Sequence, residues 1–131
     1  MREETRVTLR VPFQASSVSD VRRDLRTWMR KRGSTGDRID DARVVVSELV
    51  ANSVRHAQPL ADGSLIVDWR LDDRRLHISV TDGGGTTDPH IIDAPVSATS
   101  GRGMAIVETL VDDWWLEHTP TRTTIHTLMD L

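Results

Sequence analysis

The chain has 131 residues, a length that suits one domain spanning 1–131, because a chain of this size buries roughly two-thirds of its unfolded surface around a single core. Seventeen Lys and Arg residues against 20 Asp and Glu residues leave a formal net charge of -3, which argues against a direct nucleic-acid partner. The absence of cysteine excludes disulfides and thiolate chemistry and fits a cytoplasmic protein. There is no signal-peptide core and no apolar run of about 18 residues, so we expect no membrane contact.

The first part of the chain predicts a strand and then a helix. Apolar and polar residues alternate over 7–12, which is the period of a half-buried strand. Apolar residues then recur at helical spacing over 18–29. Ser17 and Asp20 are placed as a capping box for this helix, and Gly33 is placed as its terminator.

The remaining segments predict one more long helix, two pairs of strands and a short helix. In chain order they are a helix over 39–57, hairpin strands over 65–71 and 76–80 that turn at Asp72-Asp73, a mobile loop over 86–100, a helix over 103–111, and strands over 114–118 and 123–129. This order predicts a two-layer α/β sandwich, in which a mixed or antiparallel sheet carries all its helices on one face.

Two further groups of charged side chains have ordinary explanations. Arg22, Arg26 and Arg30 recur at four-residue steps along the first helix. The simpler interpretation is a solvated face, and the alternative is an electrostatic docking patch for an acidic partner. Histidines without paired ligand spacing are expected to be structural or solvated, and they are His77, His90, His118 and His126.

The second helix carries a carboxylate and a carboxamide one turn apart. At about 100° per residue, Glu48 and Asn52 lie at the edge of an apolar arc, and His56 continues their row. Magnesium prefers oxygen ligands and completes its shell with waters and substrate phosphates, so one carboxamide with a carboxylate nearby is a sufficient protein contribution. An ordinary polar row on a half-buried helix is the alternative interpretation. The arc consists of Ala42, Val45, Val46, Leu49, Val50 and Ser53.

Two glycine-containing segments add the features of a nucleotide site. Asp82 ends a predicted strand and is followed by Gly83–Gly85, where backbone without a Cβ approaches a flat ligand closely. The Asp82 carboxylate is suited to accept a hydrogen bond from an adenine amino group. Gly101–Gly103 opens a predicted helix whose free N–H groups attract phosphate, and Arg102 adds charge-assisted contacts. Taken singly, each segment also fits a purely structural turn or helix start.

Together, and in this order, the three motifs resemble the ATP-binding domain shared by gyrase, the heat-shock chaperone ATPase, sensor histidine kinases and mismatch-repair ATPases. Within that superfamily the chain is most similar to the small anti-sigma-factor serine kinases, and the similarity covers nearly all of its length. The resemblance implies the Bergerat-type ATP-binding fold, with the loop over 86–100 as a mobile lid over ATP. The motifs that carry it are Ser47–Ala57, Val80–Gly85 and Ser100–Val107.

The resemblance also implies a role for each motif residue. Glu48 is implied to be the general base, Asn52 the Mg2+ ligand and Asp82 the residue that reads adenine. The third motif is implied to close over the phosphates. The residues implied to bind Mg2+-ATP are Asn52, Arg55, His56, Asp82, Gly84, Gly101, Arg102, Gly103, Met104 and Thr124.

Two positions depart from the family pattern. Thr86 stands where another glycine often ends the second motif, and Arg122 stands where glycine often begins the final threonine motif. The threonine beside adenine therefore falls on Thr123 or Thr124, and we take Thr124 as the predicted contact.

The function implied by the resemblance is that of an anti-sigma factor and serine protein kinase. Such a protein sequesters a sigma factor and phosphorylates an anti-anti-sigma protein on serine, using ATP and Mg2+, and the family resemblance suggests a homodimer. The chain is too short to hold its own acceptor, which favours a free-standing nucleotide-binding domain. The alternative is a non-catalytic module of the same fold, whose loop over 86–100 orders on ATP and gates partner binding.

Overall fold

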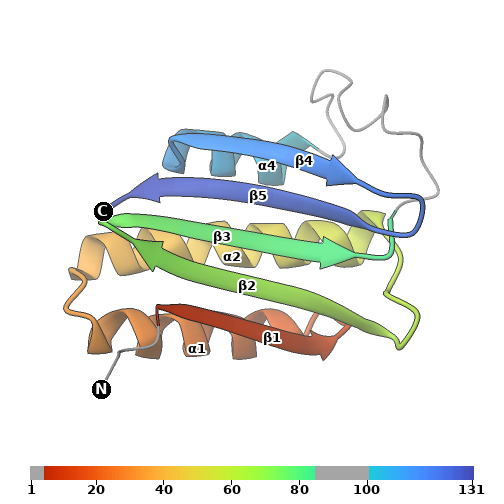
Figure 1. Ribbon diagram of the computed structural model, residues 1–131, viewed down its shortest axis with the longest axis horizontal. Coiled ribbons are helices and arrows are strands. Elements are labelled where there is room, and N and C mark those ends of the chain that lie inside the picture. The colour runs from red at the N-terminus through yellow and green to blue at the C-terminus, as the bar shows by residue number, and fades with distance from the viewer. Residues whose placement is uncertain (1–4, 85–100) are drawn as a thin grey trace.

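The computed structural model describes residues 5–84 and 101–131, with backbone alone for 101–103. Within these ranges the strands form one antiparallel sheet in the order β1-β2-β3-β5-β4, and the helices all cover the same face (Figure 1). The predicted two-layer α/β sandwich is therefore confirmed. In chain order the elements are β1 (Arg6–Pro12), α1 (Ser17–Lys31), α2 (Gly36–His56), β2 (Ser64–Asp72), β3 (Arg75–Asp82), α4 (Gly101–Leu110), β4 (Asp113–His118) and β5 (Thr123–Asp130).

The core lies between the two layers and follows from the alternation of the strands. Val67 of β2 pairs with Leu9 on one side and with Val80 on the other, and all three side chains point toward the helices. Trp69 is the largest fully buried side chain, and its ring meets the edge of Trp28 from α1 at a centroid distance of 6.3 Å. The rest of the core is aliphatic, with methionines filling gaps.

The first helix ends as predicted but begins differently. Gly33 has a φ of +77° and its N–H bonds to the carbonyl oxygen of Arg30, which is the expected glycine terminator. The predicted capping box is wrong. The N-cap residue is Ser16, which makes no side-chain capping bond, and the hydroxyl of Ser17 instead donates to the carbonyl oxygen of Pro12 at 2.7 Å. Ser17 thus anchors the helix start to the end of β1.

The second helix begins three residues earlier than predicted, at Gly36, and ends at His56. Every member of its predicted apolar arc is buried, while Glu48 and Asn52 are half-buried at the edge, as the periodicity indicates. With 21 residues it is the longest helix of the described ranges, and none of the helices there combines the length and apolar character that crossing a bilayer requires.

The hairpin between β2 and β3 turns one residue later than predicted. Asp72 is still in the ladder, paired with Arg75, and the two turn residues are Asp73 and Arg74. Their φ values are 52° and 69°. Two consecutive positive φ values are typical of the tight two-residue hairpin, because that turn matches the twist of the strands. The Asp72-Asp73 turn was therefore placed one residue too early.

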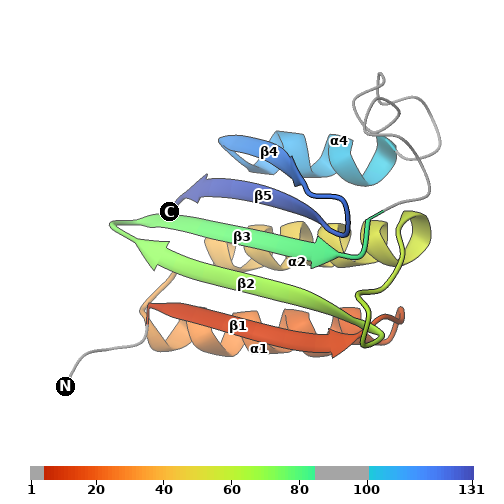
Figure 2. The same ribbon diagram turned by 45° about the vertical axis from the view of Figure 1, so that its right-hand side comes forward.

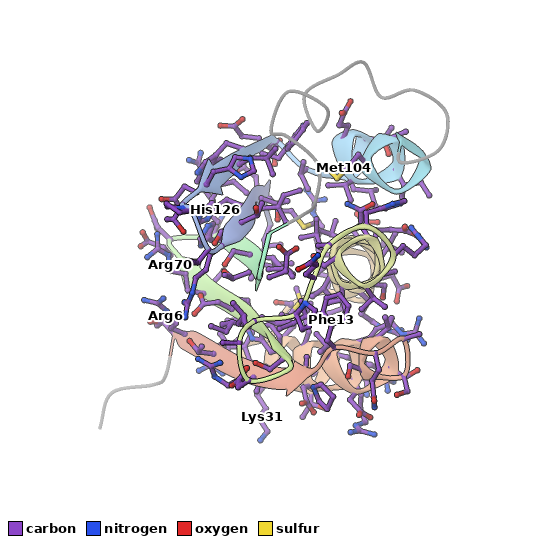
Figure 3. All side chains as sticks on the ribbon, turned by 90° about the vertical axis from the view of Figure 1, so that its right-hand side faces the viewer. Arg6, Phe13, Lys31, Arg70, Met104 and His126 are labelled. Carbon is purple, nitrogen blue, oxygen red and sulfur yellow. The ribbon has the colours of Figure 1, made fainter. Side chains whose placement is uncertain are left out.

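The face of the sheet that points away from the helices carries a stack of rings. His77 and His126 lie side by side with a nitrogen-to-nitrogen distance of 2.9 Å, and the ring of Trp115 stacks on His126 at 4.9 Å between centroids. Glu117 bonds the other nitrogen of His126. Figure 3 shows His126 on this open face together with Arg70. Both histidines are therefore held by contacts with neighbouring side chains on this face.

The fold brings four chain segments to the same end of the molecule. The arrow of β3 ends there, and the last turn of α2, the first turn of α4 and the first residues of β5 lie at the same end in both views (Figures 1 and 2). These are the segments that carry the three sequence motifs and the threonine pair. The topology therefore gathers the predicted site residues at one edge of the sandwich.

Candidate nucleotide site

Asp82 is the central residue of this edge. It is the last residue of β3, its side chain points into the helix layer, and only 6% of the residue is exposed. The hydroxyl of Ser53 donates to its Oδ2 at 2.8 Å and the N–H of Gly84 donates to its Oδ1 at 2.8 Å. Burial raises the pKa of this carboxyl above its ordinary value, and the two hydrogen bonds oppose that shift. A buried carboxyl with unused acceptor positions suits an amino group of a flat ligand.

The loop after Asp82 is held by the segment that follows α2. Gly83 donates its N–H to the carbonyl oxygen of Gln58 at 2.8 Å, and Gln58 donates its own to Gly84 at 2.9 Å. A Cβ on Gly83 would stand 2.1 Å from the carbonyl oxygen of Pro59, so no side chain fits there. Gly84 has a φ of +85°, a conformation that favours glycine. The glycines are thus needed for the packing of this loop as well as for close approach of a ligand.

Asn52 presents an oxygen that the described residues leave without a partner. Its Oδ1 is buried and has no hydrogen-bond partner among residues 5–84 and 104–131. An unmatched buried carbonyl oxygen is costly, and it is also the type of ligand that Mg2+ prefers. Asn52 is one residue from Ser53, which bonds Asp82. The donor set at this edge therefore fits a nucleotide with its magnesium ion.

Glu48 lies one helical turn before Asn52 and opens onto a groove. The groove has a volume of about 360 Å³. It runs between α1 and α2. Glu48 is one of its lining residues, so its half-buried carboxylate is within reach of a molecule that enters the groove from solvent. The residues that line it are Arg22, Asp40, Arg43, Val44, Ser47 and Glu48.

The third motif supplies a helix start at the same end. Gly101 is the first residue of α4, so the unpaired N–H groups of the first turn and the positive end of the helix dipole belong to 101–103. Met104 is 9% exposed and sits on the side of α4 that faces the sheet (Figure 3). Met104 is therefore part of the core beneath the helix start. The side chain of Arg102 and the predicted lid over 86–100 lie outside the described residues.

The two candidate threonines point to opposite faces of the sheet. Thr124 faces away from the helices, with its Oγ1 2.8 Å from Oγ1 of Thr81. Thr123 pairs with Asp82 across the ladder and shares its face. The Oγ1 of Thr123 lies 3.0 Å from Nδ1 of His118 and 3.7 Å from the position a Cβ on Gly84 would take. The structure thus brings Thr123, and not Thr124, to the predicted site.

Arg55 and His56, also predicted to bind the nucleotide, are exposed on the last turn of α2. No hydrogen bond or ion pair within the described ranges ties either side chain to Asp82. Sequence reasoning did not assign site roles to Ser53, Gln58 or His118. Only Ser53 carried a signal, because it is a hydroxyl within an otherwise apolar helical arc. The roles of Gln58 and His118 depend on chain segments that meet only in the fold.

Comparison with known proteins finds a family and relatives that match most of this chain. The model of the histidine kinase-like ATPase domain family matches residues 11–128. A serine-protein kinase RsbW from Listeria innocua is 30% identical over 120 residues, which cover 82% of this chain and 76% of the relative. A serine-protein kinase RsbW from Bacillus thuringiensis is 27% identical over 133 residues, which cover 93% of this chain and 83% of the relative.

Solved structures share the fold at lower identity. The crystal structure of the RsbU and RsbW domains of Rv1364c from Mycobacterium tuberculosis matches 98% of this chain with a TM-score of 0.76 and 24% identity. This chain spans 33% of that longer one. A chain of the SiaB-SiaC complex from Pseudomonas aeruginosa matches 94% of this chain and 88% of its own length, with a TM-score of 0.64 and 10% identity.

Proposed function

This chain belongs to the histidine kinase-like ATPase domain family and is a serine-protein kinase that uses ATP, and we propose that it acts as an anti-sigma factor whose phosphoacceptor is an anti-anti-sigma protein. The observation that carries the proposal is the contact between Ser53 and Asp82. It joins the helix of the first motif to the loop of the second, beside the oxygen of Asn52 that no described residue hydrogen-bonds. Ser53 and Asp82 are 29 residues apart in the sequence, and their contact supports the proposal that the two motifs contribute to one site.

In this site each described residue has one role. Asp82 accepts a hydrogen bond from the adenine amino group, and Thr123 lies beside it on the same face of the sheet. Asn52 holds the magnesium ion, and Glu48 stands one turn away on the same helix. The backbone at the start of α4 meets the phosphates, because unpaired N–H groups and the helix dipole attract negative charge there. Magnesium, when bound, neutralises charge on the phosphates.

The transfer step needs a base within hydrogen-bond reach of the acceptor serine. Glu48 takes the proton from the serine hydroxyl as the serine oxygen bonds to the γ-phosphorus. The bond from that phosphorus to the bridging oxygen breaks, and ADP leaves with the electron pair. Phosphoryl transfer depends mainly on positioning and charge neutralisation, and the residues around Asp82 and Asn52 supply the positioning.

The proposed partners are those that the family resemblance implies. We propose that the protein sequesters a sigma factor and releases it according to the phosphorylation state of the anti-anti-sigma protein. The fold is shared with a chain of the SiaB-SiaC complex, which supports a role in partner binding. We extend the proposal to a homodimer in the cytoplasm, with residues 1–131 as one kinase domain. The cysteine-free composition agrees with that compartment.

The test is phosphate transfer from labelled ATP, with Mg2+, to purified candidate anti-anti-sigma proteins. We expect transfer to a serine by the wild-type protein and a loss of at least a hundredfold in Glu48→Ala, because general base catalysis contributes on the order of a hundredfold or more. Glu108→Ala, which removes an exposed carboxylate from α4, is the matched control and should be fully active. Calorimetry should show that ATP still binds to Glu48→Ala.

Two outcomes would contradict the proposal. Transfer by Glu48→Ala at the wild-type rate would remove Glu48 from the reaction. ATP-dependent binding of the partner without any transfer by the wild-type protein would instead support the non-catalytic ATP-gated module.

A further inference from the structure

His118 lies beside Thr123 at the end of the β4–β5 hairpin that is next to its turn. The two residues are partners in the antiparallel ladder, so their side chains lie on the face that Asp82 also shares. The Nδ1 of His118 is 3.0 Å from the Oγ1 of Thr123, which is a hydrogen-bond distance. His118 is exposed to solvent at the last position of β4. The threonine of the proposed adenine site is thus held by a histidine from the neighbouring strand.

The hydroxyl of Thr123 serves a ligand in one of two ways. A hydroxyl has one proton to donate, together with lone pairs that accept. When Nδ1 of His118 carries no proton, Thr123 donates to it and has only lone pairs left for a ligand. When Nδ1 carries a proton, it donates to Thr123, and the proton of Thr123 is free for a ligand. The state of His118 therefore sets the direction of the bond that Thr123 offers.

Adenine presents a donor and an acceptor side by side. Its amino group donates, and the ring nitrogen N1 next to that group accepts. The Asp82 carboxylate takes the amino group, so a second group that bonds N1 has to donate. Thr123 lies opposite Asp82 in the ladder, and its Oγ1 lies 3.7 Å from the position a Cβ on Gly84 would take, so its hydroxyl faces the glycine loop. Thr123 is placed to be the donor to N1 if its proton is free.

Asp82 is an ionisable group that faces His118. Burial raises the pKa of the Asp82 carboxyl, and a positive charge on His118 is among the influences that oppose this rise. Glu117 lies on the other face of β4, where it bonds His126, and Arg122 is exposed in the turn that joins β4 to β5. The next pair along this face of β4 and β5 and the side chains that α4 packs on it are apolar, and they are Leu116, Ile125, Met104 and Val107.

We propose that His118 is a positioning residue of the adenine site, which directs the Thr123 hydroxyl so that it donates to N1 of the base. The inference rests on the proposed nucleotide-binding function and adds a residue for which the sequence predicted only a structural or solvated role. Histidine ordinarily titrates between about pH 5 and pH 8. As His118 loses its proton with rising pH, its Nδ1 competes with N1 for the proton of Thr123, and adenine keeps only the bond to Asp82.

The experiment compares ATP with 1-deaza-ATP, which lacks the N1 acceptor and keeps the amino group. Calorimetry measures both Kd values for the wild-type protein from about pH 5 to about pH 8. ATP should bind about fivefold more tightly than 1-deaza-ATP at the acidic end, and this advantage should fall below about twofold at the basic end. 7-Deaza-ATP, which retains N1, should bind like ATP throughout. The triphosphate and Asp82 are common to all titrations, so their own ionisation largely cancels in the ratios.

Variants of His118 provide the second measurement. His118→Asn keeps an amide that donates to Thr123 but does not titrate, so the advantage of ATP over 1-deaza-ATP should persist at every pH. His118→Leu should weaken ATP binding about threefold, and it should add nothing in a Thr123→Val background, because the two residues act as one unit. His126→Asn, which removes a histidine from the open face of the sheet, is the matched control and should keep the wild-type pH profile.

Two results would overturn the inference and leave the nucleotide site standing. One is an advantage of ATP over 1-deaza-ATP that does not change with pH in the wild type, a measurement that does not depend on how any variant folds. The other is a folded His118→Leu protein that binds ATP as the wild type does, or that loses as much affinity with Thr123→Val as without it. Absence of ATP binding by the wild type at every pH would count against the proposed function itself.

Discussion

Thr123 lies directly opposite Asp82 in the antiparallel pairing of β3 with β5, and both side chains face the helix layer. The next residue, Thr124, points to the other face and meets Thr81 there. Because neighbouring residues of a strand alternate between faces, only one of the two threonines is available to a ligand held by Asp82. The register of a single strand pair therefore decides which hydroxyl belongs to the site.

The first prediction compares these two threonines. Thr123→Val should weaken ATP binding about fivefold, because one hydrogen bond contributes about 1 kcal/mol and valine keeps the shape of the side chain. Thr124→Val should leave the Kd for ATP within twofold, since it loses only the contact with Thr81 on the open face. Calorimetric titration of ATP into both variants checks this, and an equal effect of both substitutions would contradict the assignment.

The second prediction concerns the pH dependence of stability at Asp82. Because burial raises its folded-state pKa above 3.8, the folded protein holds this proton more tightly than the unfolded chain does. The contribution of this protonated carboxyl to stability is fully present below the pKa of Asp82 in the unfolded chain. It is lost as pH rises through the raised pKa of Asp82 in the folded protein. Asp82→Asn cannot ionise. We therefore expect the difference in free energy of unfolding, Asp82→Asn minus wild type, to increase as pH rises across this window.

Urea unfolding of both proteins at a series of pH values from below 3.8 to neutral measures that difference, and the other titrating groups largely cancel in the comparison. The same Asp82→Asn protein should bind ATP at least tenfold more weakly, because a hydrogen bond to a charged acceptor contributes about 1.5–3 kcal/mol. A variant that is less stable at neutral pH and binds ATP normally would show that Asp82 is structural only.

The third prediction contrasts two neighbouring residues of α2. Asn52→Ala should leave the ligand-free protein as stable as the wild type or about 1 kcal/mol more stable, because it removes a buried oxygen that has no hydrogen-bond partner among residues 5–84 and 104–131, and alanine is the better helix former. Ser53→Ala should destabilise by about 1–3 kcal/mol, because it strips a donor from the buried Asp82 carboxylate. Urea unfolding measures both changes.

Magnesium dependence provides the functional half of that contrast. In the wild type, chelation of Mg2+ with EDTA should weaken ATP binding, whereas in Asn52→Ala the affinity should be low and insensitive to EDTA. A strong loss of ligand-free stability in Asn52→Ala would indicate that the carboxamide has a structural partner and would count against its role as a metal ligand.

The fourth prediction separates two adjacent glycines. Gly83→Ala should destabilise by at least about 3 kcal/mol, since its methyl group would overlap the Pro59 carbonyl and the backbone would have to shift. Gly84→Ala has room for the methyl group and should cost only about 1–2 kcal/mol, the penalty for a positive φ. Thermal unfolding ranks the two, and equal losses would contradict the packing argument.

The elements themselves could be predicted because their signals are local. The helical arc of α2 repeats within a single segment, and the alternation in β2 and β3 needs no knowledge of their partners. Local signals failed where a more distant group competes. Ser17 is not the N-cap because it is already the first residue of the helix, where its hydroxyl donates to the carbonyl oxygen of Pro12. The hairpin turn moved by one residue because the register continued to the pair of Asp72 with Arg75.

The site was predictable in kind and less so in detail. The motif residues Asn52 and Asp82 lie where the sequence order suggested, and Ser53 links their segments. The choice of Thr124 over Thr123 depended on the parity of β5. Ile125 and Met129 share the buried face with Thr123, but Leu128 lies on the other face and weakens that signal, so the pairing with β3 decides the parity. The roles of Gln58 and Pro59 likewise arise only where the end of α2 meets the glycine loop.

The reciprocal backbone bonds between Gln58 and the loop of Gly83 and Gly84 have a thermodynamic consequence. They hold the backbone of Gly83 and Gly84 in place before any ligand arrives, so at the proposed adenine site the entropy of ordering these two residues is lost during folding and not during binding. Adenosine, which lacks the phosphates, should therefore associate without a large heat-capacity change from local folding. Recognition of the base then behaves as docking into a rigid receptor.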